Sequence, residues 1–125
     1  MIPTRVHGVI DYIYGLALIA APFLFGFADG TAAQWVPIVI GLATIGMSLL
    51  TRYELGAIKV LPMLAHISID GVAGLVLLAS PWTFGFADRI WWPHVLFGAI
   101  AIVVPLLTAR KSPIELRDRG LSPSA

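Results

Sequence analysis

The chain has 125 residues, of which 58% are hydrophobic and 12% are charged, with a formal net charge of +1. A soluble domain has roughly 25% charged residues, and a globule this small buries only about two-thirds of its unfolded surface, so the composition excludes an ordinary water-soluble fold. The small net charge indicates no nucleic-acid partner, and the absence of cysteine excludes disulfides and thiolate chemistry. The lipid bilayer is therefore the expected partner.

Four long runs almost free of charge follow one another along the chain. They cover residues 6–28, 30–51, 60–87 and 90–109, and Asp11 and Asp70 are the only charged residues inside them. A helix needs roughly 20 apolar residues to cross about 30 Å of hydrocarbon, so each run is long enough for one crossing. A signal peptide is the alternative for the first run, but its cleavage would destroy half of an internal repeat. The pattern predicts an all-α protein with four transmembrane helices.

An internal repeat relates the two halves of the chain. With a shift of 59 residues, 14 of the 27 positions from Pro3 to Asp29 are identical to those from Pro62 to Asp88. The following helices align as well, with Trp35 opposite Trp92 and the pairs Gly41/Gly98 and Thr51/Thr108 in register. We expect a first two-helix unit at 1–57, a second at 58–109 and a tail at 110–125. Each unit contains two crossings, so both hairpins share one orientation in a four-helix bundle.

A short motif in the second unit resembles a known family. The run Ser80-Pro81-Trp82, followed by Phe84-Gly85-Phe86, is similar to the motif of the SPW repeat family, which comprises small bacterial membrane proteins built from two-helix units. The first copy departs from this motif, with Ala21-Pro22-Phe23 in its place. The resemblance implies the architecture and a place in the bacterial cytoplasmic membrane, and it implies no biochemical activity.

The basic residues predict the orientation in the membrane. Seven would lie in the cytoplasm if both termini do, and only Arg89 would lie outside, which is the arrangement that the positive-inside rule favours. All four tryptophans then fall near the outer interface, where an indole keeps its N–H hydrated and its ring in lipid. The seven residues are Arg5, Arg52, Lys59, Arg110, Lys111, Arg117 and Arg119.

Pro22 and Pro81 predict the ends of the first and third helices. Each proline removes a backbone donor and disfavours helical geometry at the preceding residue, so each helix is expected to end or kink there. The hydroxyls of Ser80 and Thr83 are candidate partners for the carbonyl groups that Pro81 leaves free. We interpret the motif, including Trp82, as structural rather than as part of a transport site.

Two His-x-x-x-Asp motifs are the candidate site. His7 and Asp11 in the first helix, and His66 and Asp70 in the third, share a helical face with Gly15 and Gly74. We expect the two faces to meet, with the glycines allowing a close approach of the first and third helices. The simplest role is a polar clamp that sets the register of the helices. Proton or cation handling, a metal site of two His and two Asp, and bis-histidine haem ligation remain open.

The remaining polar residues add no catalytic site. Ser68 points away from His66 and Asp70 on a helix, and the chain has no phosphate-binding glycine loop, so we predict neither an enzyme nor a bound cofactor. We expect His94 to lie at the outer interface, and Ser112-Pro113-Ile114-Glu115 to begin a short cytoplasmic helix that ends near Gly120. The predicted role is a non-catalytic structural or interaction component, with a second copy of the chain or another membrane protein as the candidate partner. The alternative is a small transporter or a proton or cation conductor.

Overall fold

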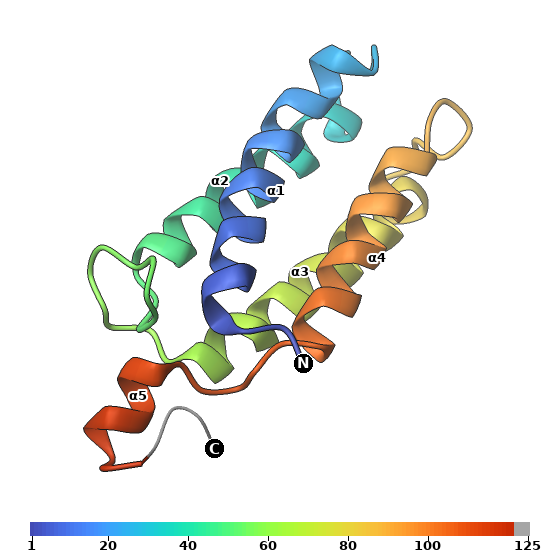
Figure 1. Cartoon of the computed structure of the whole chain (residues 1–125). Helices are drawn as coiled ribbons and strands as arrows, with labels where there is room; N and C mark the ends of the chain where they lie inside the picture. Colours follow the sequence, from blue (N-terminus) through green and yellow to red (C-terminus); the bar gives the residue numbers. More distant parts are fainter. Residues whose placement is uncertain (122–125) are drawn as a thin grey trace.

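The computed structural model describes residues 1–121 and is all-α, with five helices and no strand within that range (Figure 1). The all-α prediction is therefore confirmed. The helices, in chain order, are α1 (Thr4–Leu24), α2 (Ala32–Leu49), α3 (Met63–Thr83), α4 (Trp92–Leu106) and α5 (Pro113–Asp118). The last four residues of the predicted tail lie outside the described residues.

Three of the helices are long and apolar enough to cross a membrane. They are α1, α2 and α3, with 21, 18 and 21 residues. The fourth main helix, α4, is also apolar but shorter than the run from which it was predicted, with 15 residues. At a rise of 1.5 Å per residue it is about 22 Å long. Pro93 stands in its first turn and Pro105 in its last, so proline marks both ends of the helix.

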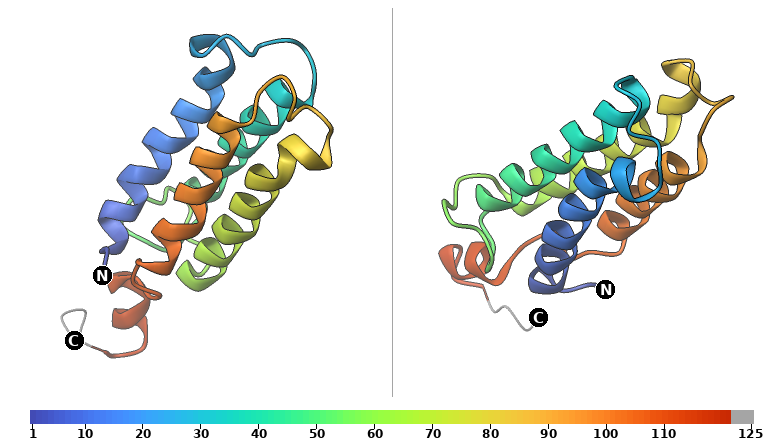
Figure 2. Two further views of the ribbon diagram at one scale, coloured as in Figure 1. Left: turned by 90° about the vertical axis from the view of Figure 1, so that its right-hand side faces the viewer. Right: turned by 90° about the horizontal axis from the view of Figure 1, so that it is seen from above.

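The main helices pack in sequential pairs. α1 lies against α2 and α3 lies against α4, and smaller contacts join α2 to α3 and α1 to α4 (Figures 1 and 2). α1 and α3 are thus placed diagonally across the centre of the molecule. The N-terminus, the α2–α3 connection and α5 lie at one end, and the α1–α2 and α3–α4 connections lie at the other.

The repeated Phe-Gly-Phe segments form the C-terminal caps of α1 and α3. Gly26 and Gly85 adopt φ values of 76° and 74°, which place them in the left-handed region that favours glycine. The next residue in each copy donates its N–H to the carbonyl of the motif proline, at 2.8 Å for both Phe27 to Pro22 and Phe86 to Pro81. This is the 6→1 hydrogen bond of a Schellman motif. The helices continue two residues beyond each proline, so the prolines fix the last turn rather than the last residue.

Ser80 compensates for the missing backbone donor of Pro81. Proline cannot donate to the carbonyl four residues before it, which here is the carbonyl of Leu77. The Ser80 hydroxyl donates to that oxygen at 2.6 Å, and both Ser80 and Leu77 are fully buried. Thr83 donates instead to Ala79 at 3.0 Å. Ser80 therefore supplies the hydrogen bond that Pro81 cannot make, which explains a serine at this position of the motif.

We expect Ser80→Ala to destabilise the protein by about 1–3 kcal/mol, because it leaves the Leu77 carbonyl unpaired in a buried, apolar place. The measurement is the free energy of unfolding in mixed micelles as dodecyl sulfate is titrated. Ser68→Ala is the matched control, since Ser68 also bonds a carbonyl of α3, that of Leu64, but on an exposed surface. Equal losses in the two variants would contradict this reading of the motif.

Two glycine pairs allow close backbone contact within the helix pairs, between α1 and α2 and between α3 and α4. A Cβ atom built on Gly15 would lie 2.9 Å from the carbonyl oxygen of Gly41, and one built on Gly74 would lie 2.9 Å from that of Gly98. Gly15 therefore faces α2 and Gly74 faces α4. The prediction that these two glycines bring α1 and α3 together is wrong, because the smallest side chains are used where antiparallel neighbours pack along their whole length.

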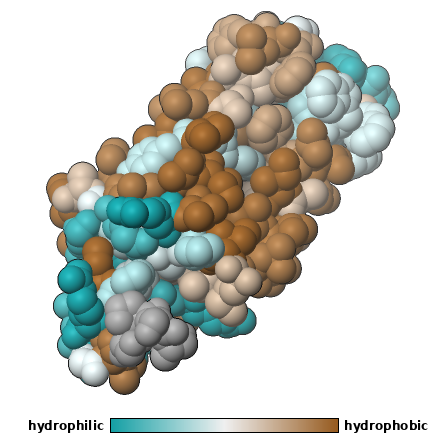
Figure 3. Space-filling view, in the orientation of Figure 1, coloured by the Kyte–Doolittle hydropathy of each residue, from teal (hydrophilic) through white to brown (hydrophobic). Residues whose placement is uncertain are grey.

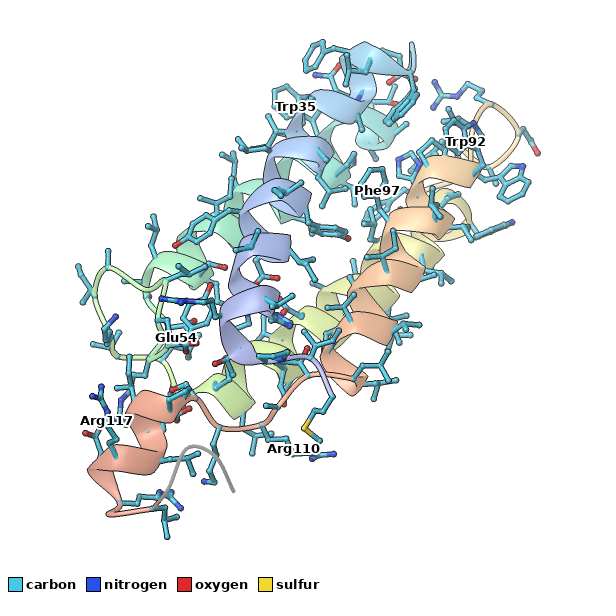
Figure 4. The ribbon with its side chains drawn as sticks, in the orientation of Figure 1. Trp35, Glu54, Trp92, Phe97, Arg110 and Arg117 are labelled. Carbon is cyan, nitrogen blue, oxygen red and sulfur yellow. The ribbon has the colours of Figure 1, made fainter. Side chains whose placement is uncertain are left out.

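The outer surface of the helices is largely apolar. Large hydrophobic side chains are exposed on all four main helices, and the space-filling view shows a broad hydrophobic body with hydrophilic residues at the end that carries α5 and a smaller hydrophilic group at the opposite end (Figure 3). The four tryptophans are about half exposed, and Trp35 and Trp92 lie at the end opposite Glu54, Arg110 and Arg117 (Figure 4). A surface of this kind suits lipid rather than water.

Candidate polar site between the helices

The two His-x-x-x-Asp motifs meet at the centre of the molecule. Nε2 of His7 lies 3.0 Å from Oδ2 of Asp70, and Nε2 of His66 lies 2.7 Å from Oδ2 of Asp11. Within each motif the corresponding distance is 3.2 Å. The histidines are fully buried, and the aspartates are only 5% and 7% exposed. We call these four residues the His–Asp cluster, and its shortest contacts join α1 to α3.

Two threonines orient the histidine rings. Nδ1 of His7 lies 2.8 Å from the hydroxyl oxygen of Thr108, and Nδ1 of His66 lies 2.6 Å from that of Thr51. Each hydroxyl has a single proton, which Thr51 donates to the Met47 carbonyl and Thr108 donates to the Val104 carbonyl, both at 2.7 Å. The hydroxyl oxygens must then accept from the histidines, so Nδ1 carries a proton in both rings.

This assignment sets the number of protons in the His–Asp cluster. With Nδ1 protonated, Nε2 of a neutral imidazole has only a lone pair, and a lone pair repels a carboxylate oxygen. Each of the two shortest Nε2–Oδ2 contacts therefore needs one proton, held either by the ring or by the carboxyl group. In both cases the cluster is electrically neutral as a whole, which removes most of the cost of burying two carboxylates.

The contacts of the His–Asp cluster have twofold pseudosymmetry and cross between the halves of the chain. Each histidine bonds an aspartate and a threonine from the other half. Backbone hydrogen bonds beside the cluster also join the two halves of the chain. The N–H of Ile2 donates to the carbonyl of Leu107 at 2.6 Å, and the N–H of Leu61 donates to the carbonyl of Leu50 at 2.7 Å. These bonds belong to two isolated parallel β-bridges, Ile2 with Thr108 and Thr51 with Leu61, which occupy equivalent positions in the two halves. Side chains and backbone thus join the halves at the same level of the molecule.

Other side chains enclose the His–Asp cluster. The Ser48 hydroxyl donates to Oδ2 of Asp11 at 3.2 Å, and the fully buried ring of Tyr53 lies 5.7 Å from the ring of His66. Burial raises the pKa of the Tyr53 phenol. Next to His7 and both aspartates is a cavity of about 20 Å³, lined by residues of all four main helices. A cavity of this size has room for one water molecule, and His7 and the two aspartates give an otherwise largely apolar lining one polar side.

The tail docks on the end of the molecule nearest the His–Asp cluster. Ser112 and Glu115 form the predicted capping box of α5, and the Glu115 carboxylate also accepts from the N–H of Met63, the first residue of α3, at 3.2 Å. Arg52 pairs with Asp118. Glu54 accepts from the hydroxyl of Thr4, the first residue of α1, at 2.8 Å. A carboxylate therefore stands at the positive N-terminal end of both helices that carry the cluster.

The opposite end has its own contacts between the halves. Arg89 pairs with Asp29 at 2.5 Å, and hydrogen bonds from Thr31, with the charge of Arg89, hold the pKa of Asp29 below its usual range. The prediction that His94 is interfacial is wrong, because its side chain is buried between the rings of Phe27 and Phe86. The second phenylalanine of each Phe-Gly-Phe segment covers it, and its Nε2–H donates to the Ala33 carbonyl at 2.8 Å.

The predicted site residues thus fall into three groups. His7, Asp11, His66 and Asp70 come together as expected, Gly15 and Gly74 lie at the helix-pair contacts, and the motif residues Pro22, Ser80, Pro81 and Trp82 lie at the far end of α1 and α3. The sequence reasoning did not assign Thr51 and Thr108 to the site. Their identity in the repeat alignment was the available indication, because a polar residue kept in both copies of an apolar helix end needs a partner.

Comparison with known proteins identifies the family. The profile described as the SPW repeat domain matches residues 5–108. The chain belongs to this family of membrane-associated repeat domains, which confirms the resemblance and, together with the three long apolar helices, defines a multi-pass membrane protein. No curated protein and no solved structure matches the chain.

Proposed function

We propose that the protein is a non-catalytic structural or interaction component of the bacterial cytoplasmic membrane. In this proposal two tandem hairpins of equal orientation form a four-helix transmembrane bundle, with both termini in the cytoplasm. The His–Asp cluster holds the two hairpins in register. The exposed apolar surface of the bundle contacts lipid, a second copy of the chain or another membrane protein.

The observation that carries the proposal is the complementarity of the His–Asp cluster. Both ring nitrogens of each histidine and at least one oxygen of each aspartate have a partner, and the shortest contacts join the two halves of the chain. Placing an ionisable group in hydrocarbon costs free energy unless the group is paired. Here the pairing fixes the register between α1 and α3, whose other side chains are mostly apolar. Such a closed arrangement favours a clamp over a group that exchanges with solvent during a reaction.

The fourth crossing is supported by the packing of α4. Although α4 is about 22 Å long, it lies antiparallel to α3 along its length, and both connections at the far end carry aromatic residues. Ile90 and Trp91 precede its first residue, and Leu107 follows its last, so apolar residues extend beyond both helix ends. A short crossing next to a longer one is accommodated by local thinning of the bilayer.

Labelling of single cysteines tests the four crossings and the orientation. The chain has no cysteine, so Asp88→Cys, Ala57→Cys and Lys111→Cys each introduce one thiol, at exposed positions in the α3–α4, α2–α3 and α4–α5 connections. We expect a membrane-impermeant maleimide added to intact cells to label Asp88→Cys, and to label Ala57→Cys and Lys111→Cys only after lysis. Labelling of Lys111→Cys from outside together with Asp88→Cys would contradict a crossing by α4, and labelling of Ala57→Cys but not Asp88→Cys would contradict the cytoplasmic termini.

A further inference from the structure

We propose that the His–Asp cluster is a binding site for one divalent transition-metal ion of the zinc class, held by Nε2 of His7 and His66 and one carboxylate oxygen each from Asp11 and Asp70. The proposal deepens the clamp described above, because a bound ion would fasten α1 to α3 at the same point. Imidazole nitrogen and carboxylate oxygen are ligands that zinc accepts in four-coordinate sites.

The spacing of the four side chains is close to that of a tetrahedral site. Ligand atoms at zinc distances of about 2.0–2.1 Å lie about 3.3 Å apart in a tetrahedron. With Oδ2 of each aspartate as the ligand atom, three of the six separations measure 2.7, 3.0 and 3.2 Å. Nε2 of His7 lies 3.2 Å from the other oxygen of Asp11, Oδ1. One ligand atom from each of the four residues can be chosen so that all lie within 4.8 Å of one another. Shifts of a few tenths of an ångström in most of these separations would open room for the ion.

The two threonines supply what metal-bound histidines require. A histidine that binds a metal through Nε2 almost always donates its Nδ1–H to a neighbouring acceptor, which fixes the tautomer and the plane of the ring. Thr51 and Thr108 accept that proton at 2.6 and 2.8 Å, and their own protons are directed to helix carbonyls. Both Nε2 atoms therefore point at the carboxylates with their ring orientation already set.

The charge balance favours a doubly charged ion. The two shortest Nε2–Oδ2 contacts need one proton each, so the His–Asp cluster is neutral with two protons in it. One divalent cation that replaces these two protons, and releases them to solvent, leaves two neutral imidazoles, two carboxylates and the same net charge of zero. A monovalent ion would leave a buried negative charge, and a trivalent ion would leave a positive one.

The test uses the full chain, purified in detergent and stripped with EDTA. Zinc chloride is titrated by calorimetry at one pH in two buffers of different ionisation enthalpy. We expect one zinc per chain and the release of about two protons, as the exchange requires. Cobalt(II) in place of zinc should give the strong visible absorption of a four-coordinate ion with nitrogen and oxygen ligands.

Variants locate the site. Asp11→Asn and Asp70→Asn should each weaken zinc binding by more than about 100-fold, because each removes a ligand. Asp88→Asn is the matched control, since Asp88 is exposed and belongs to another aspartate pair kept in both copies, and it should leave binding unchanged. Thr51→Val keeps all four ligands and should weaken binding by about 10–100-fold, because the ring of His66 loses its acceptor. This variant and the parent decide the question even where an aspartate variant fails to fold.

Three results would overturn the site. These are the absence of stoichiometric zinc binding by the parent, binding that Asp11→Asn and Thr51→Val leave undiminished, and binding without release of protons. The clamp is tested separately, because the stability of the variants is measured in EDTA. Loss of stability on breaking the cluster, with no zinc bound by the parent, would refute the metal site and leave the clamp in place. Zinc binding by a cluster whose disruption leaves stability unchanged would refute the clamp alone.

Discussion

Asp11→Ala is expected to lower the free energy of unfolding by about 3–5 kcal/mol, the largest loss of any single substitution considered, because it removes one partner from a buried, charge-balanced cluster. Asp11 contacts His66 at 2.7 Å and His7 at 3.2 Å, and it also accepts from Ser48. The substitution leaves both Nε2 atoms facing a single carboxylate. The measurement is unfolding by dodecyl sulfate in mixed micelles containing EDTA, followed by far-ultraviolet circular dichroism.

A double-mutant cycle separates the clamp from a general effect of removing a side chain. Asp11→Ala and His66→Ala should together cost at least about 1 kcal/mol less than the sum of the single losses, because the two residues share one interaction. Asp88→Ala, in the exposed α3–α4 connection, should change stability by no more than about 0.5 kcal/mol. Additive losses in the cycle, or a loss from Asp11→Ala as small as that of the control, would refute the clamp.

Gly74→Ala is expected to destabilise the protein by about 1–3 kcal/mol although it adds only one methyl group. That methyl group would lie 2.9 Å from both the Gly98 carbonyl oxygen and the Cβ atom of Ala101, and 3.0 Å from Ile102. Two of these neighbours are backbone or Cβ atoms that no rotamer change can move, so α3 and α4 must separate. The same unfolding titration measures the loss.

Gly71→Ala is the matched control on the same helix, one turn earlier. A Cβ atom there meets nothing within 4 Å, so the substitution removes a flexible glycine from a helix without a clash and should leave stability unchanged or raise it by up to about 1 kcal/mol. Gly41→Ala and Gly46→Ala form the corresponding pair on α2, where the same contrast is expected. Similar effects of Gly74→Ala and Gly71→Ala would show that close helix contact does not limit the size of residue 74.

Much of the fold could be predicted from particular residues. The uncharged runs located the four main helices, and the identity of His7 with His66 and of Asp11 with Asp70 in the repeat indicated one shared site. The partners of that site were harder to find. Thr51 and Thr108 lie 15 and 101 residues from the histidines they contact, and nothing local connects a threonine at a helix end with a distant imidazole.

The glycines show the same limit. Gly15 and Gly74 lie within about 80° of the His–Asp motifs around their helices. A sector this wide can face either the diagonal helix or the adjacent one, so the sequence pattern could not tell which helix each glycine contacts. The sequence by itself determined the helical class, the duplication and the pairing of two imidazoles with two carboxylates, because these follow from local composition and from identity between copies. Only the tertiary structure decided which helix each glycine touches, how the threonines set the tautomers and how α4 is shortened. Those features depend on the distances and rotations between helices, which no single segment encodes.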